Sequence, residues 1–174
     1  AEPRFDLTIV PCSTQHLQLS EARKLTRLYI PRTFNALTKG YDAMMFEDFG
    51  PLALESSHIE NFRRAVEETG LGLGLIEFAN WGAGSNYMDM WMKTTLYPAF
   101  PAEVDMSTDI PADKGRIYYR ILRRDPIFNL PGIEQIPINS GHQGDLCPRL
   151  GSVVDAEWKG RGTPALVTGK FGKG

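Results

Sequence analysis

The sequence has few features of a disulfide-bonded protein, a metal protein or a membrane protein. It contains two cysteines among 174 residues, Cys12 and Cys147, far apart and without metal-binding or CxxC spacing. We therefore expect two buried free thiols, and a disulfide only if the protein is exported. No apolar run reaches the roughly 18 residues of a membrane span, and we recognise no signal peptide. A cytoplasmic location is favoured, and export stays open.

The sequence also lacks an excess of charge of either sign, because 19 basic and 21 acidic residues give a formal net charge of −2. Hydrophobic residues make up 42% and charged residues 23% of the chain, as is typical of globular proteins. This balance predicts no general attraction to nucleic acid or to anionic membranes. The length is sufficient for one domain with its own core, so we expect a single domain over residues 1–174.

The order of the predicted elements favours an α/β fold. Residues 41–48 and 71–79 are predicted strands, and residues 54–70 between them predict a helix. Ser57 and Glu60 have capping-box spacing at the start of this helix. A strand, a helix and a second strand joined by short links predict two parallel strands.

Other segments are assigned more briefly. Residues 14–30 predict a weak helix that ends at Pro31. Residues 87–100 are rich in Met and aromatic residues and predict a short helix or an ordered loop, with an apolar patch that a partner would cover if it were exposed. The remaining predicted elements are strands at 5–12, 102–106 and 115–124, and a late β-hairpin from 151–160 and 163–174.

Four stretches resemble class I glutamine-amidotransferase-like proteins, near the uncharacterised amidotransferase-like and trehalose-utilisation-like domains. These stretches are YIPRTFNALTKGYDAMMFEDFG, HIENFRRAVEETGLGLGLIEFANWGAG, DPIFNLPGI and AEWKGRGTPALVTGKFGKG. The resemblance implies a flavodoxin-like three-layer sandwich with a mostly parallel sheet. Relative to the family, the chain begins after the first strand and stops before the last, so we expect a fragment or a sheet completed by a partner.

The turn after residues 71–79 is where the family carries its nucleophilic cysteine. Here the turn offers no cysteine, and no His-x-Glu spacing follows it on a late strand, where the family carries its other catalytic residues. We therefore name no catalytic residue and expect no glutaminase chemistry. Ser85 lies past the turn and has no evident histidine partner.

Two groups of residues are candidates for ligand binding. Asp48 ends the first of the two parallel strands and should lie near the turn that ends the second, because ligands bind outside the carboxyl ends of such strands. A later polar stretch, 139–147, is either a surface loop or part of a sugar or metal site, but it lacks a third metal ligand. The candidate ligand-binding residues are Asp48, Asn80, Trp81, Gly82, Gly84, Ser85, His142 and Asp145. We expect His16 and His58 to face solvent.

The sequence thus supports a non-catalytic amidotransferase-like domain that binds a small ligand or serves as an interaction or assembly module. Its partners would be other protein subunits, a second copy of the chain, or a small polar or sugar ligand. Two alternatives stay open: a sugar-acting enzyme of the trehalose-utilisation-like kind, and an amidotransferase completed by another chain. We predict no resident cofactor and no metal.

Overall fold

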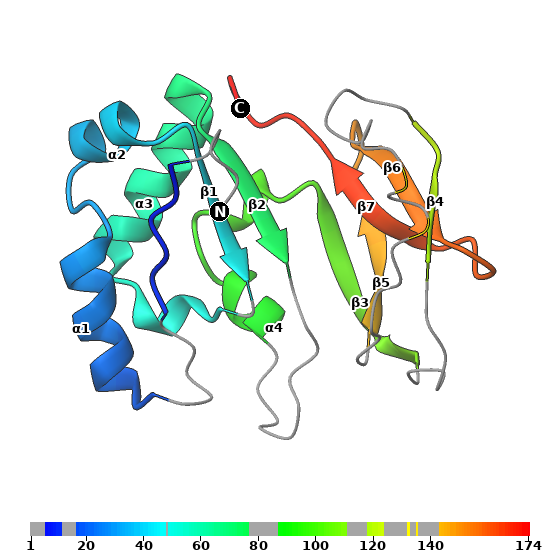
Figure 1. The fold of residues 1–174 in the computed structure, drawn as a ribbon, viewed down its shortest axis with the longest axis horizontal. Helices are drawn as coiled ribbons and strands as arrows, with labels where there is room; N and C mark the ends of the chain where they lie inside the picture. Colours follow the sequence, from blue (N-terminus) through cyan, green and yellow to red (C-terminus); the bar gives the residue numbers. More distant parts are fainter. Residues whose placement is uncertain are drawn as a thin grey trace. The chain divides into compact units, whose positions relative to one another are not determined.

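A computed structural model describes residues 6–11, 17–47, 49–76, 87–110, 118–123, 132, 135 and 143–174. The chain divides into two compact units, one built mainly from residues 1–77, 87–97 and 172–174, and the other from residues 78–86 and 98–171. Helices and strands alternate in the first unit, and the second consists mainly of antiparallel strands (Figure 1). The fold class is therefore α/β, as predicted, whereas the expectation of one domain stays a prediction.

The first unit centres on two parallel strands joined by a helix. Strand β1 (Ala43–Glu47) pairs in parallel with β2 (Gly72–Ile76), and the connection contains α3 (Ser56–Arg64). The strand, helix and strand predicted from the sequence are thus confirmed. The helices α1 (Leu19–Tyr29) and α2 (Phe34–Gly40) precede them, the 3₁₀ turn η1 (Pro51–Ala53) leads into α3, and α4 (Tyr87–Trp91) follows β2.

Local chemistry explains where the helices begin and end. Helix α1 ends at Tyr29, and Ile30 caps it just before Pro31, in agreement with the predicted proline stop. Thr33 caps α2 by accepting a hydrogen bond from the Ala36 amide. Helix α3 continues into a π-helical turn, η2 (Ala65–Thr69), and Gly70 closes it at a φ of 85°.

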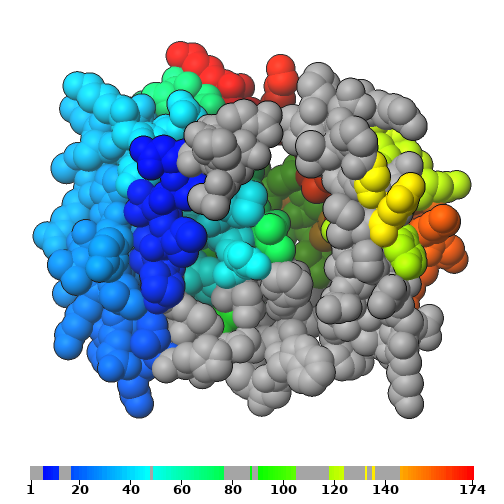
Figure 2. All heavy atoms as spheres, viewed as in Figure 1, coloured from blue at the N-terminus to red at the C-terminus, as the bar shows by residue number. Residues whose placement is uncertain are grey.

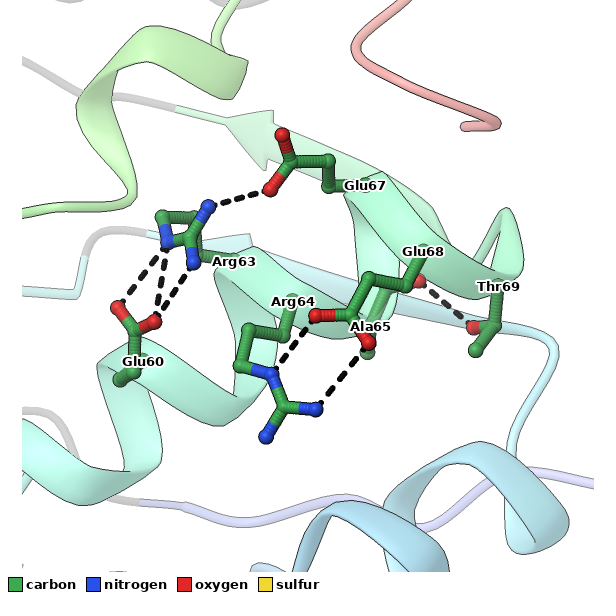
Figure 3. Close-up of polar contacts among 7 residues, drawn as sticks. All are labelled: Glu60, Arg63, Arg64, Ala65, Glu67, Glu68 and Thr69. Atoms are coloured by element: carbon green, nitrogen blue, oxygen red, sulfur yellow. Dashed lines mark hydrogen bonds and ion pairs between the residues drawn. The ribbon is translucent and has the colours of Figure 1, made fainter.

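Charged side chains along α3 and η2 pair with one another (Figure 3). Arg63 donates to both carboxylate oxygens of Glu60 and also contacts Glu67, while Arg64 donates to Glu68 at 2.8 and 3.1 Å. The hydrogen bonds from Arg63 lower the pKa of Glu60. Because these opposite charges lie three or four residues apart, they pair along the surface of the helix.

The core of the first unit is a cluster of aromatic rings around Phe46 of β1. The Phe46 ring lies 4.9 Å from that of Trp91 and 5.6 Å from that of Phe62, measured between centroids. The Trp91 indole N–H donates to the backbone carbonyl of Phe49 at 2.9 Å, which satisfies the polar atom of a fully buried side chain. One face of the β1–β2 pair is therefore well packed.

The second unit contains two antiparallel sheets. Strand β3 (Ala102–Ile110) pairs with β5 (Gln143–Pro148), and β6 (Val153–Trp158) pairs with both β4 (Tyr119–Ile121) and β7 (Pro164–Thr168). The predicted late hairpin is confirmed as β6 and β7. Among the described strands only β1 and β2 are parallel, so the flavodoxin-like three-layer arrangement stays a prediction.

Three local predictions are wrong. Residues 6–11 are extended but not in a regular strand, because a strand needs a backbone ladder that composition alone cannot supply. Residues 143–148 form a strand and not the surface loop that their polar, glycine-punctuated sequence indicated. The cap of α3 lies at Glu55 and His58, two residues before the predicted pair Ser57 and Glu60.

Candidate functional site

The carboxyl ends of β1 and β2 lie side by side, as the sequence predicts. Glu47 and Ile76 are register partners at the last position of the two strands. The predicted Asp48 follows Glu47 directly, and the predicted turn begins after Ile76. The candidate ligand residues on this turn are Asn80, Trp81, Gly82, Gly84 and Ser85; with Asp48 they lie outside the described residues. The structure therefore confirms the strand ends that precede these residues and leaves their side chains as predictions.

The second candidate group falls on β5 of the other unit. The backbone of Asp145 pairs with Asp105 of β3 in an antiparallel ladder, and His142 lies outside the described residues. Cys147 on the same strand is a free thiol and exposed, which corrects the expectation of burial. Its register partner Glu103 is exposed as well, so this side of the ladder faces water. Cys12 lies outside the described residues.

A buried histidine between α1 and α3 was missed at the sequence level. His58 is 1% exposed, although it was expected to face solvent. Its Nδ1 accepts a hydrogen bond of 3.4 Å from the Glu55 amide, so the imidazole acts as part of the helix cap. Burial lowers the pKa of His58, with Arg32 and Arg27 nearby and Glu55 acting in the opposite direction. His16 lies outside the described residues.

A buried carboxylate holds the second unit's three-stranded sheet. Asp155 of β6 is fully buried and lies 2.8 Å from the Nε of Arg123, and the Thr168 hydroxyl of β7 donates to it. The register of β6 and β7 is irregular at this residue, as expected for a β-bulge. All of these contacts are internal, so we assign Asp155 a structural role. In the described part of the chain, no group of three or more His, Cys, Asp or Glu side chains could hold a metal ion.

The Met-rich and aromatic segment 87–100 is not an exposed patch. Four of its large apolar residues are buried, namely Tyr87, Trp91, Leu96 and Phe100. Among the side chains of this segment whose burial the structure describes, the exposed large apolar one is Met92, at 49%. The condition for a partner surface, an exposed apolar patch, is not met here, because most of the described side chains fill the core instead.

The uncovered apolar surface lies on β1 and β2. Register partners point to the same side of a sheet and successive residues to opposite sides. One side carries Phe46 and is packed against Phe62 of α3. The other side, which we call the open face, carries Ala43, Met45, Glu47, Gly72, Gly74 and Ile76. On this face Met45 is 66% exposed and Ile76 is 39% exposed.

The continuous apolar run AMMF of β1 is typical of a strand covered on both faces, and the open face shows that β1 is not covered in this way. Strands of parallel sheets in α/β proteins are normally buried on both faces. The extended segment 6–11 lies beside β1 and leaves part of that strand open to view (Figure 2), with the Tyr41 hydroxyl 3.4 Å from that of Thr8. In this segment Leu7 is 63% exposed and Ile9 is 77% exposed. The apolar surface is thus larger than scattered single residues would make it.

Comparisons with known proteins bear on the fold alone. No family model and no curated protein matches the chain. Similar solved structures include two cytoplasmic proteins of Salmonella typhimurium. The cytoplasmic protein STM1381 from Salmonella typhimurium LT2 has a TM-score of 0.61, is 22% identical and covers 83% of this chain. The cytoplasmic protein STM3548 from Salmonella typhimurium has a TM-score of 0.58, is 18% identical and covers 88% of this chain.

This chain spans less than two thirds of both proteins, 62% of the first and 64% of the second. At these identities the likeness supports an α/β fold. In the described residues no helix is long and apolar enough to cross a membrane.

Proposed function

We propose that the chain is a non-catalytic glutamine-amidotransferase-like domain that acts by contact with another polypeptide. The observation that supports this is the open face, where Met45 stays 66% exposed on a parallel strand whose other side packs against a helix. Uncovered apolar area of this kind favours association, because burying it lowers the free energy by about 25 cal/mol for each Å² of apolar surface taken out of water.

The non-catalytic part of the proposal rests on the sequence. The predicted turn after β2 contains no cysteine, and the His-x-Glu of the chain, His58 and Glu60, lies before this turn on α3 and not on a late strand. Acyl transfer by the mechanism of the family needs a thiolate and a histidine oriented by an acid. The flavodoxin-like arrangement and a cytoplasmic location belong to the same proposal, and the cytoplasmic names of the two similar structures support the latter.

Position-specific crosslinking tests the contact. A photoreactive methionine analogue is placed at position 45 in one protein and at position 92 in another, in cells of the source organism. Met92 is a matched control because it is also an exposed methionine of this unit, at 49%. We expect a crosslinked species larger than 19.5 kDa from position 45 and not from position 92. Equal crosslinking from both positions, or from neither, would contradict the proposal.

A second function, binding of a small polar ligand, is favoured by the paired strand ends. Glu47 and Ile76 bring the two carboxyl ends to one edge, which is where open α/β sheets bind ligands. Glucose, trehalose and glutamine serve as probes in calorimetric titrations. We expect one of them to bind, and Asp48→Asn to weaken it at least tenfold. Asp42→Asn, at the opposite end of β1, is the matched control. Release of ammonia from glutamine or hydrolysis of the disaccharide would contradict a non-catalytic domain.

A further inference from the structure

The shape of the open face indicates what kind of element it accepts. Gly72 and Gly74 have no side chains, and a Cβ added at Gly74 would lie 3.2 Å from the Met45 methyl carbon. The face is therefore shallow, with one long flexible side chain lying across the neighbouring strand. Glycines in a strand mark sites of close approach by another backbone, and methionine adapts its shape to a partner.

The charge around the face has one sign. Three segments form this side of the unit: residues 6–11, 41–47 and 71–76. Together they carry three carboxylates and no basic residue: Glu47 lies on the open face, Asp6 lies on the neighbouring segment, and Asp42 precedes β1 on the side of Phe46. All three residues are exposed. A second copy placed face to face would bring these like charges together, which is unfavourable. A partner with basic residues beside an apolar stripe is complementary.

We propose that the open face binds an amphipathic helix of another polypeptide, with an apolar stripe over Met45 and Ile76 and Lys or Arg beside Glu47. This inference rests on the proposed contact function and names its partner. Helices are the elements that cover parallel sheets, and five-residue strands span about 16 Å. About eleven residues of helix cover that length, so apolar residues at i, i+3, i+4 and i+7 suffice for the contact.

The helix of α1 is not such a partner within a second copy. Its buried residues are Ala22 and Thr26, so the side opposite to them carries Lys24 and Leu28 rather than an apolar stripe. Leu28 is 72% exposed, and the adjacent Tyr29 is 52% exposed. This makes Leu28 a useful control position, because it matches Met45 in exposure and lies on another element.

Synthetic peptides test the proposal on the 174-residue chain. The first is an 18-residue peptide with leucines on one helical stripe and lysines at its borders. The second has glutamates in place of the lysines, and the third keeps the lysines but has a central proline that breaks the helix. Binding is followed by fluorescence anisotropy. We expect the lysine peptide to bind at least tenfold more tightly than either of the others.

Variants of the chain assign the site. Met45→Gln should weaken binding of the lysine peptide at least tenfold, and Leu28→Gln should leave it within twofold. Glu47→Lys should shift the preference toward the glutamate peptide. Equal binding of the proline peptide, or no effect of Met45→Gln, would overturn the helical partner. Self-association of the chain that Met45→Gln abolishes would also overturn the helical partner, but it would agree with the contact function. Absence of crosslinks from position 45 overturns the contact function itself.

Discussion

At the scale of single residues, His58 shows how burial changes a side chain's chemistry. A histidine on an exposed helix start would titrate freely, but His58 is 1% exposed and its Nδ1 accepts from the Glu55 amide. Protonation would place an N–H against that amide and would put a charge in a desolvated site, with Arg27 and Arg32 nearby. The neutral imidazole is therefore the form that fits the fold.

The lowered pKa of His58 predicts a pH-dependent stability. Below about pH 6.5 a histidine of the unfolded chain binds a proton, whereas folded His58 resists it. The unfolded state then binds more protons, so the free energy of unfolding falls as pH falls below that value, by at most about 1.4 kcal/mol per pH unit. Urea unfolding between pH 5 and 7.5 measures the slope, above the range in which Glu60 and Glu68 lose their lowered-pKa contributions.

His58→Gln should flatten this slope even if it lowers stability at every pH. A His58→Gln protein that kept the full slope would show that another group is responsible.

Trp91 tests the aromatic core at the same scale. Trp91→Phe removes the indole donor and leaves the buried Phe49 carbonyl without it. We expect a loss of about 1–3 kcal/mol in the free energy of unfolding, measured by urea denaturation. Met92→Leu, next to it and 49% exposed, should change stability by less than about 0.5 kcal/mol. Similar losses in both variants would contradict the assignment of Trp91 to the core.

At the scale of elements, residues 172–174 pack against the turn between η2 and β2. The Lys173 amide donates to the Glu67 carbonyl at 2.9 Å, and Gly172 has a φ of 63°. A Cβ at Gly172 would overlap the Glu67 carbonyl oxygen and would lie 2.6 Å from the Cα of Glu67. Only glycine therefore fits this position, both for its backbone conformation and for its neighbour.

Gly172→Ala should destabilise the chain more than Gly160→Ala does. Both glycines have positive φ, but a Cβ at Gly160 meets nothing within 4 Å. Gly160→Ala should cost about 1–2 kcal/mol from backbone strain alone, and Gly172→Ala should cost more because of the overlap with Glu67. Thermal unfolding of both variants measures the difference. Equal losses would mean that residues 172–174 can shift to accommodate the added Cβ without a further loss of stability, which would contradict the prediction.

At the scale of the whole molecule, local patterns predicted some features and missed others for a definite reason. The β1–α3–β2 connection and the β6–β7 hairpin were predictable, because periodicity, caps and turn glycines lie within each segment. The irregular state of residues 6–11 and the strand at 143–148 were not, because both depend on whether a distant strand supplies a ladder.

The candidate site was predictable to the same extent. Parallel pairing of β1 and β2 follows from sequence, and with it the shared edge that precedes Asp48 and Asn80. The open face did not follow, because a continuous apolar run such as AMMF indicates burial on both sides. The sequence left open whether the segment around Trp91 is core or interface, since composition does not tell the two apart.

The mass of the native assembly, measured by light scattering on material purified from its source, tests the central claim most directly. If the open face is a contact surface, the chain should elute with a second polypeptide at a mass well above 19.5 kDa. The Met45→Gln variant should instead elute alone, at 19.5 kDa. A wild-type chain that runs at 19.5 kDa in freshly purified material would contradict the account.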